Sequence, residues 1–462
     1  MPLKPKEEVI EYLDNKKDWL INVSKTIWEY AEVALNEHKS SKLLADVLEK
    51  EGFKVQIGVA DLPTAFVASW GNGRPTIGYL AEYDALPGLS TVKKGSPGHG
   101  CGHNLLGTSF VAAALATKNT MQKHNVKGEI RVYGCPAEET LYGKVVMAAK
   151  GLFDDLDAAL QWHPGSKTTS AYDSFNGLDN KTYRFYGKAA HAGSIPWEGK
   201  SALDAVQLFN LGIEFMREHM RQTERIHYVI KSGGEAPNIV PDYSEVWVFV
   251  RSPDMNHLME LSRRVDLCSI AASLATGTTC KIERNIGCYL ILPNKTLSLI
   301  VDENLKMLGP IKLTDKEREF IRTQLSKVYE KFPEEILPTK GWEIGGDWIG
   351  ETGSTDVGDV SWIVPTNGTL WIGTFPSGAA FHSLDTAKMS NTSIGYKGMI
   401  LAAKTLACTT VDLLSRPEII KESWKEFKKR KEVLREDYKP LTPAELKYPE
   451  YTGKAKTIPK NQ

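Results

Sequence analysis

The sequence predicts an α/β protein in which a mixed-sheet domain is interrupted by an inserted βαββαβ domain. Two observations lead to this prediction. Segments with strand-like and helix-like apolar periods alternate along residues 1–179, and the alternation resumes toward the C-terminus. Between these parts the order changes to strand, helix, strand, strand, helix, strand. We therefore expect an outer domain of residues 1–179 and 293–462 around an inserted domain of residues 180–292.

The outer domain begins with helices. Residues 6–52 read as two amphipathic helices, because apolar residues in SKLLADVLEKEGF recur at i, i+3 and i+4 before a glycine. The stretch TAFVASWGNGRPTIGYLAEYDALPG predicts two strands joined as a hairpin at Asn72-Gly73. The elements expected next are a helix over 104–123, the strand EIRVYG, a helix over 141–150 and the strand AALQW.

The inserted domain has the element order of a ferredoxin-like unit. Its expected elements are the strands KTYRFYG, IHYVIKSG, SEVWVFVRS and TTCKIERN and helices over 201–220 and 257–275. The outer domain resumes with TLWIGTFPSG and a helix over 393–414. The charged segment after Arg416 predicts a solvated helix followed by a wrapping arm.

Composition excludes several classes of function. Lys+Arg and Asp+Glu both number 57 among 462 residues, so no net charge favours nucleic acid or a membrane surface. The stretch MPLKPKEEVIEYLDNKKDWL has charges throughout, unlike a signal peptide or a transmembrane helix. Six cysteines form no CxxC pair and no disulfide framework. We expect a cytoplasmic protein that binds neither nucleic acid nor membranes.

A glycine-rich stretch, PGHGCGHNLLGTS, places His99, Cys101 and His103 ahead of a predicted helix. It is not a nucleotide-binding loop, because no third glycine completes GxGxxG and no Gly-Lys-Ser/Thr occurs there. The remaining cysteine and histidines are typical metal ligands. A serine hydrolase is also disfavoured, because the sequence contains no G-x-S-x-G.

Further polar residues follow predicted strands, at the sheet edge where open α/β sheets bind ligands. They are Glu82, Asp84, Glu138, Glu139, His163 and His382. Two adjacent carboxylates at a strand end are costly unless a positive group faces them. Neighbouring extended residues point in opposite directions, so one glutamate can bind a metal while the other faces the substrate. Cysteine, histidine and carboxylate together match the ligands of Zn²⁺ or Mn²⁺.

These motifs also stand in a recognisable order. Along the chain they are AEYDALPG, GHGCGHNLLGTS, PAEE, WHPG, GKAAHAGSIPWEGKSALDA, APNIVPD and FHS. In sequence and order they resemble the aminoacylase/carboxypeptidase family of two-metal peptidases, and within it the amidohydrolase branch that contains aminobenzoyl-glutamate and auxin-conjugate hydrolases. The resemblance covers residues 6–414 and implies a two-metal catalytic domain with an inserted lid and dimerisation domain. It further implies hydrolysis of the amide bond of N-acyl or N-aroyl amino acids.

The resemblance also implies roles for individual residues. The ligands of two divalent ions, Zn or Mn, are then Cys101, His103, Glu139, His163 and His382, with the Cys101 thiolate between the ions. Glu138 is implied as the general base, which takes a proton from water and returns it to the leaving amine. His191 is implied as a catalytic histidine, reaching the substrate from the other subunit of a homodimer, and Asn238 as a substrate-binding residue.

Other residues are expected to support the site. Asp84 matches a residue that orients a ligand. Glu82 stands where the branch usually has Asp, a change we expect to be tolerated because that residue only supports the ligands. His99 matches no ligand and is expected to be loop structure. The segment GSTDVGDVSW resembles part of the substrate pocket, without a further role for its two aspartates.

The sequence also allows two other functions. A dipeptidase or carboxypeptidase would need a free amine or carboxylate on its substrate, and the arginine that carboxypeptidase relatives use for that carboxylate is not found. A non-catalytic metal- or ligand-binding protein on the same scaffold would not need the base Glu138. The expected partners are a small-molecule amide, a second copy of the chain and a related second subunit.

Overall fold

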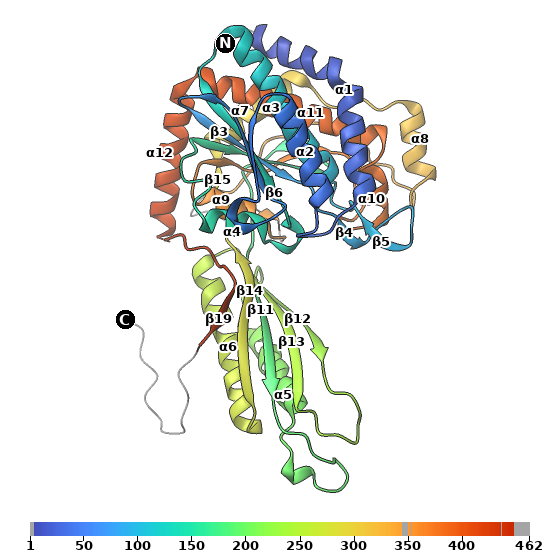
Figure 1. Cartoon of the computed structure of the whole chain (residues 1–462), viewed down its shortest axis with the longest axis vertical. Coiled ribbons are helices and arrows are strands. Elements are labelled where there is room, and N and C mark those ends of the chain that lie inside the picture. Colours follow the sequence, from blue (N-terminus) through green and yellow to red (C-terminus); the bar gives the residue numbers. More distant parts are fainter. Residues whose placement is uncertain (1–3, 344–349, 352, 436, 448–462) are drawn as a thin grey trace. The chain divides into compact units, whose positions relative to one another are not determined.

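The computed structural model describes residues 4–343, 350–351, 353–435 and 437–447 (Figure 1). The chain divides into two compact units. Unit 1 holds residues up to Leu178, the short segment Arg251–Leu258 and the segment Gly287–Leu441. Unit 2 holds Asp179–Val250, Met259–Ile286 and the described residues 442–447. As the sequence predicts, the fold is mixed α/β.

Unit 1 is built, within the described residues, on a seven-stranded sheet with the order β1-β2-β6-β3-β7-β17-β15. Its strands are β1 (Lys54–Ile57), β2 (Phe66–Asn72), β3 (Thr76–Glu82), β6 (Gly128–Cys135), β7 (Ala158–Leu160), β15 (Pro293–Asn294) and β17 (Thr366–Asn367). β3 runs parallel to both β6 and β7 and is buried along its whole length. Parallel strands end at the same edge, and Glu82 is the register partner of Cys135 there.

The predicted hairpin at Asn72-Gly73 is wrong. β6 lies between β2 and β3, antiparallel to the first and parallel to the second. The apolar residues of β6 explain this position, because Ile130 belongs to one core cluster and Tyr133 to the other. A strand with two apolar faces gains most burial in the middle of a sheet.

Helices cover both faces of this sheet (Figure 1). One core cluster joins Ile77 and Tyr79 of β3 to helices on the first face. Those helices are α1 (Lys4–Tyr30), α2 (His38–Lys50), α3 (His103–His124), α7 (Lys295–Leu308) and α11 (Ser393–Ser415). A second cluster joins Leu80 to α4 (Gly143–Ala149) and α9 (Val357–Ser361) on the other face. The sheet is thus a middle layer whose strand ends are free to carry a site.

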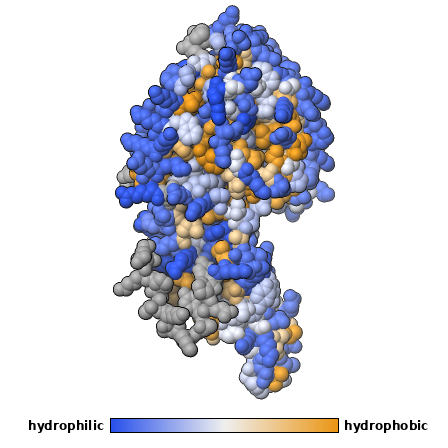
Figure 2. All heavy atoms as spheres, turned by 60° about the vertical axis from the view of Figure 1, so that its left-hand side comes forward, coloured by the Kyte–Doolittle hydropathy of each residue, from blue (hydrophilic) through white to orange (hydrophobic). Residues whose placement is uncertain are grey.

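One described helix, α11, is apolar and long enough to cross a membrane. However, 89% of its apolar window is buried inside the fold, where it packs beside α3. Hydrophilic side chains cover much of the face shown in Figure 2. We therefore assign α11 to the core of unit 1.

Unit 1 contains further described elements. They are β4 (Leu86–Gly88), β5 (Gly95–Gly98), β8 (Trp162–Gly165), β9 (Thr169–Ser170), β10 (Ser174–Phe175), β16 (Gly350–Glu351), β18 (Leu370–Gly373), α8 (Asp315–Thr323), α10 (Leu384–Met389) and α12 (Pro417–Leu434). β8 and β18 run in parallel, with His163 opposite Trp371. The predicted solvated helix α12 buries one side, including Ile419 and Phe427.

Unit 2 contains a sheet with the order β12-β13-β11-β14-β19 in the described chain. Its elements are β11 (Gly177–Tyr186), α5 (Ala202–Met216), β12 (Arg225–Ser232), β13 (Tyr243–Ser252), α6 (Met255–Thr276), β14 (Thr279–Cys288) and β19 (Ala444–Leu446). The first four strands have the ferredoxin-like order. β19 differs from the predicted wrapping arm of the outer domain, because it pairs antiparallel with β14. An unpaired edge strand readily accepts such a partner.

Candidate metal centre

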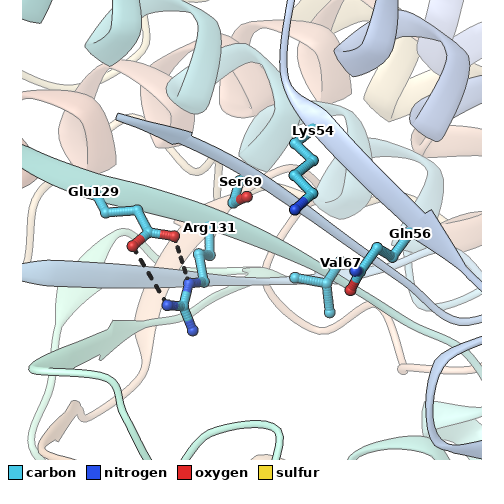
Figure 3. A pocket seen from close by; sticks show the side chains of 6 residues that line it. All are labelled: Lys54, Gln56, Val67, Ser69, Glu129 and Arg131. Atoms are coloured by element: carbon cyan, nitrogen blue, oxygen red, sulfur yellow. Dashed lines mark hydrogen bonds and ion pairs between the residues drawn. The ribbon is translucent and has the colours of Figure 1, made fainter. Parts of the chain in front are cut away.

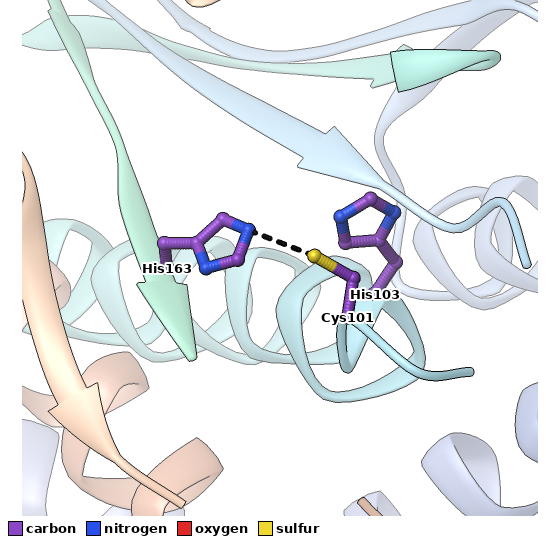
Figure 4. Close-up of side chains that lie close together, drawn as sticks. All are labelled: Cys101, His103 and His163. Carbon is purple, nitrogen blue, oxygen red and sulfur yellow. Dashed lines mark hydrogen bonds between the residues drawn. The ribbon is translucent and has the colours of Figure 1, made fainter. Parts of the chain in front are cut away.

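Cys101 and His103 stand on either side of Gly102, at the start of α3. Gly102 has a φ of 79°, and a Cβ at this position would lie 3.0 Å from Pro164 Cγ. Only glycine adopts this conformation readily, which explains the Cys-Gly-His sequence. The turn directs both flanking side chains toward His163 of β8 (Figure 4). Cys101 Sγ lies 3.4 Å from His163 Nε2.

Glu138 and Glu139 lie in a short turn, η2 (Glu138–Thr140), directly after β6. The flanking Ala137 and Leu141 have φ values of 58° and 59°. A non-glycine residue in this region costs about 1–3 kcal/mol, so the surrounding structure must hold it there. Glu37 contributes, because its carboxylate accepts a hydrogen bond from the Ala137 amide at 2.8 Å. Strain of this kind is typical of functional turns.

His382 also has a left-handed backbone, with a φ of 57°. It lies in the loop between β18 and α10, and its amide donates to the carbonyl of Gly100 in the cysteine loop. Its Nε2 lies 3.3 Å from Glu139 Oε2. The loop therefore brings a residue of the segment Gly287–Leu441 to the turn after β6.

The five predicted ligands converge as two groups. In each group the potential ligand atoms lie within 4.8 Å of one another. The first group is Cys101, His103 and His163, and the second is Cys101, Glu139 and His382. Cys101 belongs to both, which suits two ions that share one sulfur ligand.

The buried charges of the cluster fit such ions. Glu82 Oε2, His103 Nε2 and Glu139 Oε1 are buried and have no hydrogen-bond partner among the described residues. Burial and the nearby Glu139 raise the pKa of the Cys101 thiol well above its usual value. Burial raises the pKa of Glu139 to about 7. Thiolate and carboxylate forms therefore need added positive charge here, and sulfur, imidazole and carboxylate are donors that Zn²⁺ accepts.

The predicted base Glu138 is buried beside the ligands, with Oε2 3.9 Å from His103 Nε2. Burial, followed by the charges of Glu82 and Asp356, raises the pKa of Glu138 well above its usual value. A carboxylate whose pKa is raised toward the working pH is a better proton acceptor than an ordinary one. The position and surroundings of Glu138 suit a general base.

Asp84 contacts the ligands, as expected for a supporting residue. One oxygen pairs with His103 Nδ1 at 2.8 Å and the other accepts from the Glu139 amide at 2.9 Å. His99 lies apart from both ligand groups, with Nε2 3.1 Å from the carbonyl of Ile27. Burial lowers the pKa of His99 to about 4, which agrees with its interpretation as loop structure.

Sequence reasoning missed Lys144, a fully buried lysine of α4. Its Nζ lies 2.8 Å from Glu82 Oε1 and 2.5 Å from Asp356 Oδ1. A signal was present, because Lys144 is the one charged residue of GKVVMAA, close after the glutamate pair. A lone lysine in an apolar helix near two carboxylates is rarely buried without a partner.

His191 and Asn238 lie in unit 2. Both are exposed, and the amide of Ala192 donates to the Asn238 carbonyl at 3.0 Å. His191 Nδ1 accepts from the amide of Gly193 at 3.2 Å. These contacts shape one loop cluster, and the implied roles of both residues stay predictions.

A shallow cavity of about 180 Å³ lies elsewhere, over β1, β2 and β6 (Figure 3). Its lining residues are Lys54, Gln56, Val67, Ser69, Glu129 and Arg131. Glu129 and Arg131 pair with each other at 2.8 Å. None of the predicted site residues lines this cavity, so we do not assign the reaction to it.

Comparison with known proteins decides the family. The model of peptidase family M20/M25/M40 matches residues 78–386. The chain belongs to this peptidase family. The matched segment holds all five predicted ligands together with Glu138 and Asp84. The predictions of a two-metal peptidase family and of a metal-dependent amide hydrolase are confirmed.

Relatives of this M20/M25/M40 peptidase match over nearly its whole length. One subunit of the p-aminobenzoyl-glutamate hydrolase of Escherichia coli is 36% identical, over 91% of this chain and 95% of its own. The Xaa-Arg dipeptidase of Mus musculus is 34% identical, over 92% of each. Both are hydrolases of small amides by name.

Solved structures share the fold at low identity. An aminobenzoyl-glutamate utilization protein from Klebsiella pneumoniae has a TM-score of 0.63 at 17% identity, covering 87% of this chain and 97% of its own. A dinuclear metal-binding peptidase of the M20 family from Bacillus subtilis has a TM-score of 0.59 at 16% identity, covering 87% and 99%. The expected two-metal peptidase fold is thereby confirmed.

Proposed function

We propose that this peptidase-family member cleaves the amide bond of N-acyl or N-aroyl amino acids, with p-aminobenzoyl-glutamate as the first substrate to test. The observation that carries the proposal is the buried carboxylate of Glu138 beside two ligand groups that share Cys101. The relative in Escherichia coli, named for this substrate, supports the choice. A small amide, released as an amine and an acid, is the expected substrate class.

The residues of the site have separate roles in metal binding and proton transfer. Cys101, His103 and His163 would hold one divalent ion, and Cys101, Glu139 and His382 the other. Zn²⁺ and Mn²⁺ both suit this donor set, and when bound they would polarise the amide carbonyl and make water a stronger acid. Glu138 takes the proton of the attacking water and delivers it to the leaving nitrogen.

A substrate panel tests this function. The metal-supplied protein is incubated with p-aminobenzoyl-glutamate, benzoyl-glycine and N-acetyl-glutamate, and the products are measured by mass spectrometry. The matched control is Glu138→Gln, which keeps the side-chain shape but cannot accept the proton. We expect the unaltered chain to release the free amino acid about 10²-fold faster, or more, than the variant. Absence of turnover with every conjugate, despite bound metal, would contradict the proposal.

A dipeptidase remains the second candidate, because the Xaa-Arg dipeptidase relative covers as much of the chain. It differs in needing a free substrate amine. Dipeptides ending in arginine are therefore assayed beside the same dipeptides with an acetylated N-terminus. Cleavage of only the free form would favour the dipeptidase, and cleavage of only the blocked form would favour the amidohydrolase.

We also propose a homodimer that forms through unit 2. Helix α5 exposes Leu208, Leu211 and Phe215, which are spaced along one side of the helix. The edge strand β12 adds the exposed Val229 and Ile230. An exposed apolar helix side and an edge strand with exposed apolar residues both favour pairing with a second copy.

A related second subunit is a further candidate partner, because the relative in Escherichia coli is itself named as one subunit of its hydrolase. Light scattering of the chain alone separates the two proposals. For the location we propose the cytoplasm, which the six free cysteines support.

A further inference from the structure

The carboxylate of Glu82, at the end of β3, faces the candidate metal centre. Its Oε2 is buried, lacks a hydrogen-bond partner among the described residues and lies 3.4 Å from His103 Nε2. Glu82, His103 and Glu138 together form a third group of potential ligand atoms within 4.8 Å of one another. This group contains one residue that the ligand prediction did not include.

The His103 ring directs one of its two nitrogens toward Glu82. Asp84 accepts a hydrogen bond from Nδ1 at 2.8 Å, so Nε2 is the ring nitrogen that remains for the cluster. This nitrogen lies 3.4 Å from Glu82 Oε2, and both atoms are buried. The separation does not form a hydrogen bond here. A cation bound by both atoms satisfies both.

The distance also suits a common ion. Imidazole nitrogen and carboxylate oxygen bind Zn²⁺ at about 2.0–2.2 Å, so two such atoms on a tetrahedral ion lie about 3.4 Å apart. Glu82 Oε2 and His103 Nε2 have this separation, as do Cys101 Sγ and His163 Nε2. Glu82 thus stands at a ligand distance on the His103 side of the cluster.

The other oxygen of Glu82 is fixed by Lys144. Lys144 Nζ lies 2.8 Å from Glu82 Oε1 and 2.5 Å from Asp356 Oδ1, and the three side chains are at most 4% exposed. The Lys144 amide also donates to Asp356 Oδ2 at 2.8 Å, and this second contact holds Asp356 beside Lys144. Glu82 therefore spans from the lysine to the ligand cluster. An aspartate, one methylene shorter, would not reach both.

We propose that Glu82 is an additional metal ligand beside His103, positioned by Lys144 and Asp356. The inference rests on the proposed two-metal function. It replaces the expectation that Glu82 only supports the ligands. With Glu82 as a ligand, the two ions differ in their protein ligands, so we expect the two sites to differ in affinity.

Metal binding to the full-length chain tests the proposal. The metal-stripped protein is titrated with Zn²⁺ alone, in competition with a chelator, for the unaltered chain and for Glu82→Asp and Glu82→Gln. We expect each variant to lose at least about tenfold in affinity at one site and to keep the other, since even partners outside the ligand set change affinity by about 10–100-fold. The matched control is Asp412→Asn, another buried carboxylate paired with a lysine, Lys6, at 2.6 Å.

A second readout separates a ligand from a structural residue. Loss of a ligand reduces the increase in melting temperature that Zn²⁺ produces, whereas loss of a structural contact lowers the melting temperature equally with and without Zn²⁺. Equal affinities in the unaltered chain and Glu82→Asp, or an unchanged increase on adding Zn²⁺, would overturn the inference alone. If the unaltered chain binds fewer than two ions, the proposed two-metal function fails instead. Should Glu82→Gln not fold, Glu82→Asp decides.

Discussion

Asp84 and His103 form a buried pair in which the carboxylate accepts a hydrogen bond from the ring Nδ1 at 2.8 Å. The second oxygen of Asp84 accepts from the Glu139 amide at 2.9 Å. One side chain therefore orients a residue of each ligand group. Carboxylates that hold a ligand histidine in this way fix its tautomer and its direction.

The Asp84→Asn variant is expected to bind metal about 10–100-fold more weakly. An amide presents one acceptor where Asp84 uses two, so either the ring or the turn loses its partner. Chelator competition measures the change. Asp302→Asn is the control, because Asp302 is also buried but pairs with Lys306 on α7. Equal affinity in Asp84→Asn and the control would contradict this prediction.

The Glu138→Gln variant is expected to keep both ions and to lose turnover by about 10²-fold or more, the usual scale for a general base. Glu139→Gln provides the contrast, because it removes a ligand and should lose metal together with activity. Steady-state kinetics and metal analysis are run on the same samples. Near-normal turnover in Glu138→Gln would assign the base to another residue.

Removal of metal is expected to abolish activity and to lower the melting temperature. Ions that bind only the folded chain at about 100 times their dissociation constant add about 2.7 kcal/mol each to stability. Readdition of Zn²⁺ or Mn²⁺ should restore both properties at two equivalents per chain. Saturation at one equivalent would reject the two-ion arrangement.

Stability at low pH is expected to depend on Glu317, which caps α8. Burial opposes its ionisation, but hydrogen bonds from Lys397 and Ser393 outweigh this and lower the pKa of Glu317 to about 2. Because this pKa lies below the usual 4.5, the carboxylate stabilises the fold above pH 4.5, and this stabilisation is lost as the pH falls toward 2.

The Glu317→Gln variant should therefore lose less stability than the unaltered chain between pH 4.5 and 2. Melting temperatures of the metal-stripped protein across this range give the comparison. Glu319→Gln, an exposed glutamate on the same helix, is the control. Parallel curves for Glu317→Gln and the unaltered chain would show that the prediction is incorrect.

Mixing two inactive variants tests the proposed dimer and His191 together. If His191 serves the neighbouring subunit, mixing His191→Ala with Glu138→Gln should restore part of the activity. Some mixed dimers then contain one site with both residues intact. No recovery would place His191 at its own subunit's site, and full activity of His191→Ala alone, or a monomer by light scattering, would reject the arrangement.

Much of the fold follows from local sequence signals. The helices α1, α2, α3 and α11 lie where the sequence predicts them, and unit 2 has the predicted βαββαβ order. The hairpin at Asn72-Gly73 was predicted wrongly because the turn pair is a local signal, whereas the position of β6 between β2 and β3 depends on burial of both its faces.

The sequence by itself determined which residue types follow each strand, including the Cys-Gly-His turn and the adjacent glutamates, because these motifs are local. Only the tertiary structure decided which of them meet. Lys144 and Asp356 are 212 residues apart, and their contact with Glu82 requires α4, α9 and β3 to pack together. Such contacts depend on the burial of apolar faces across the whole chain, which no short stretch of sequence encodes.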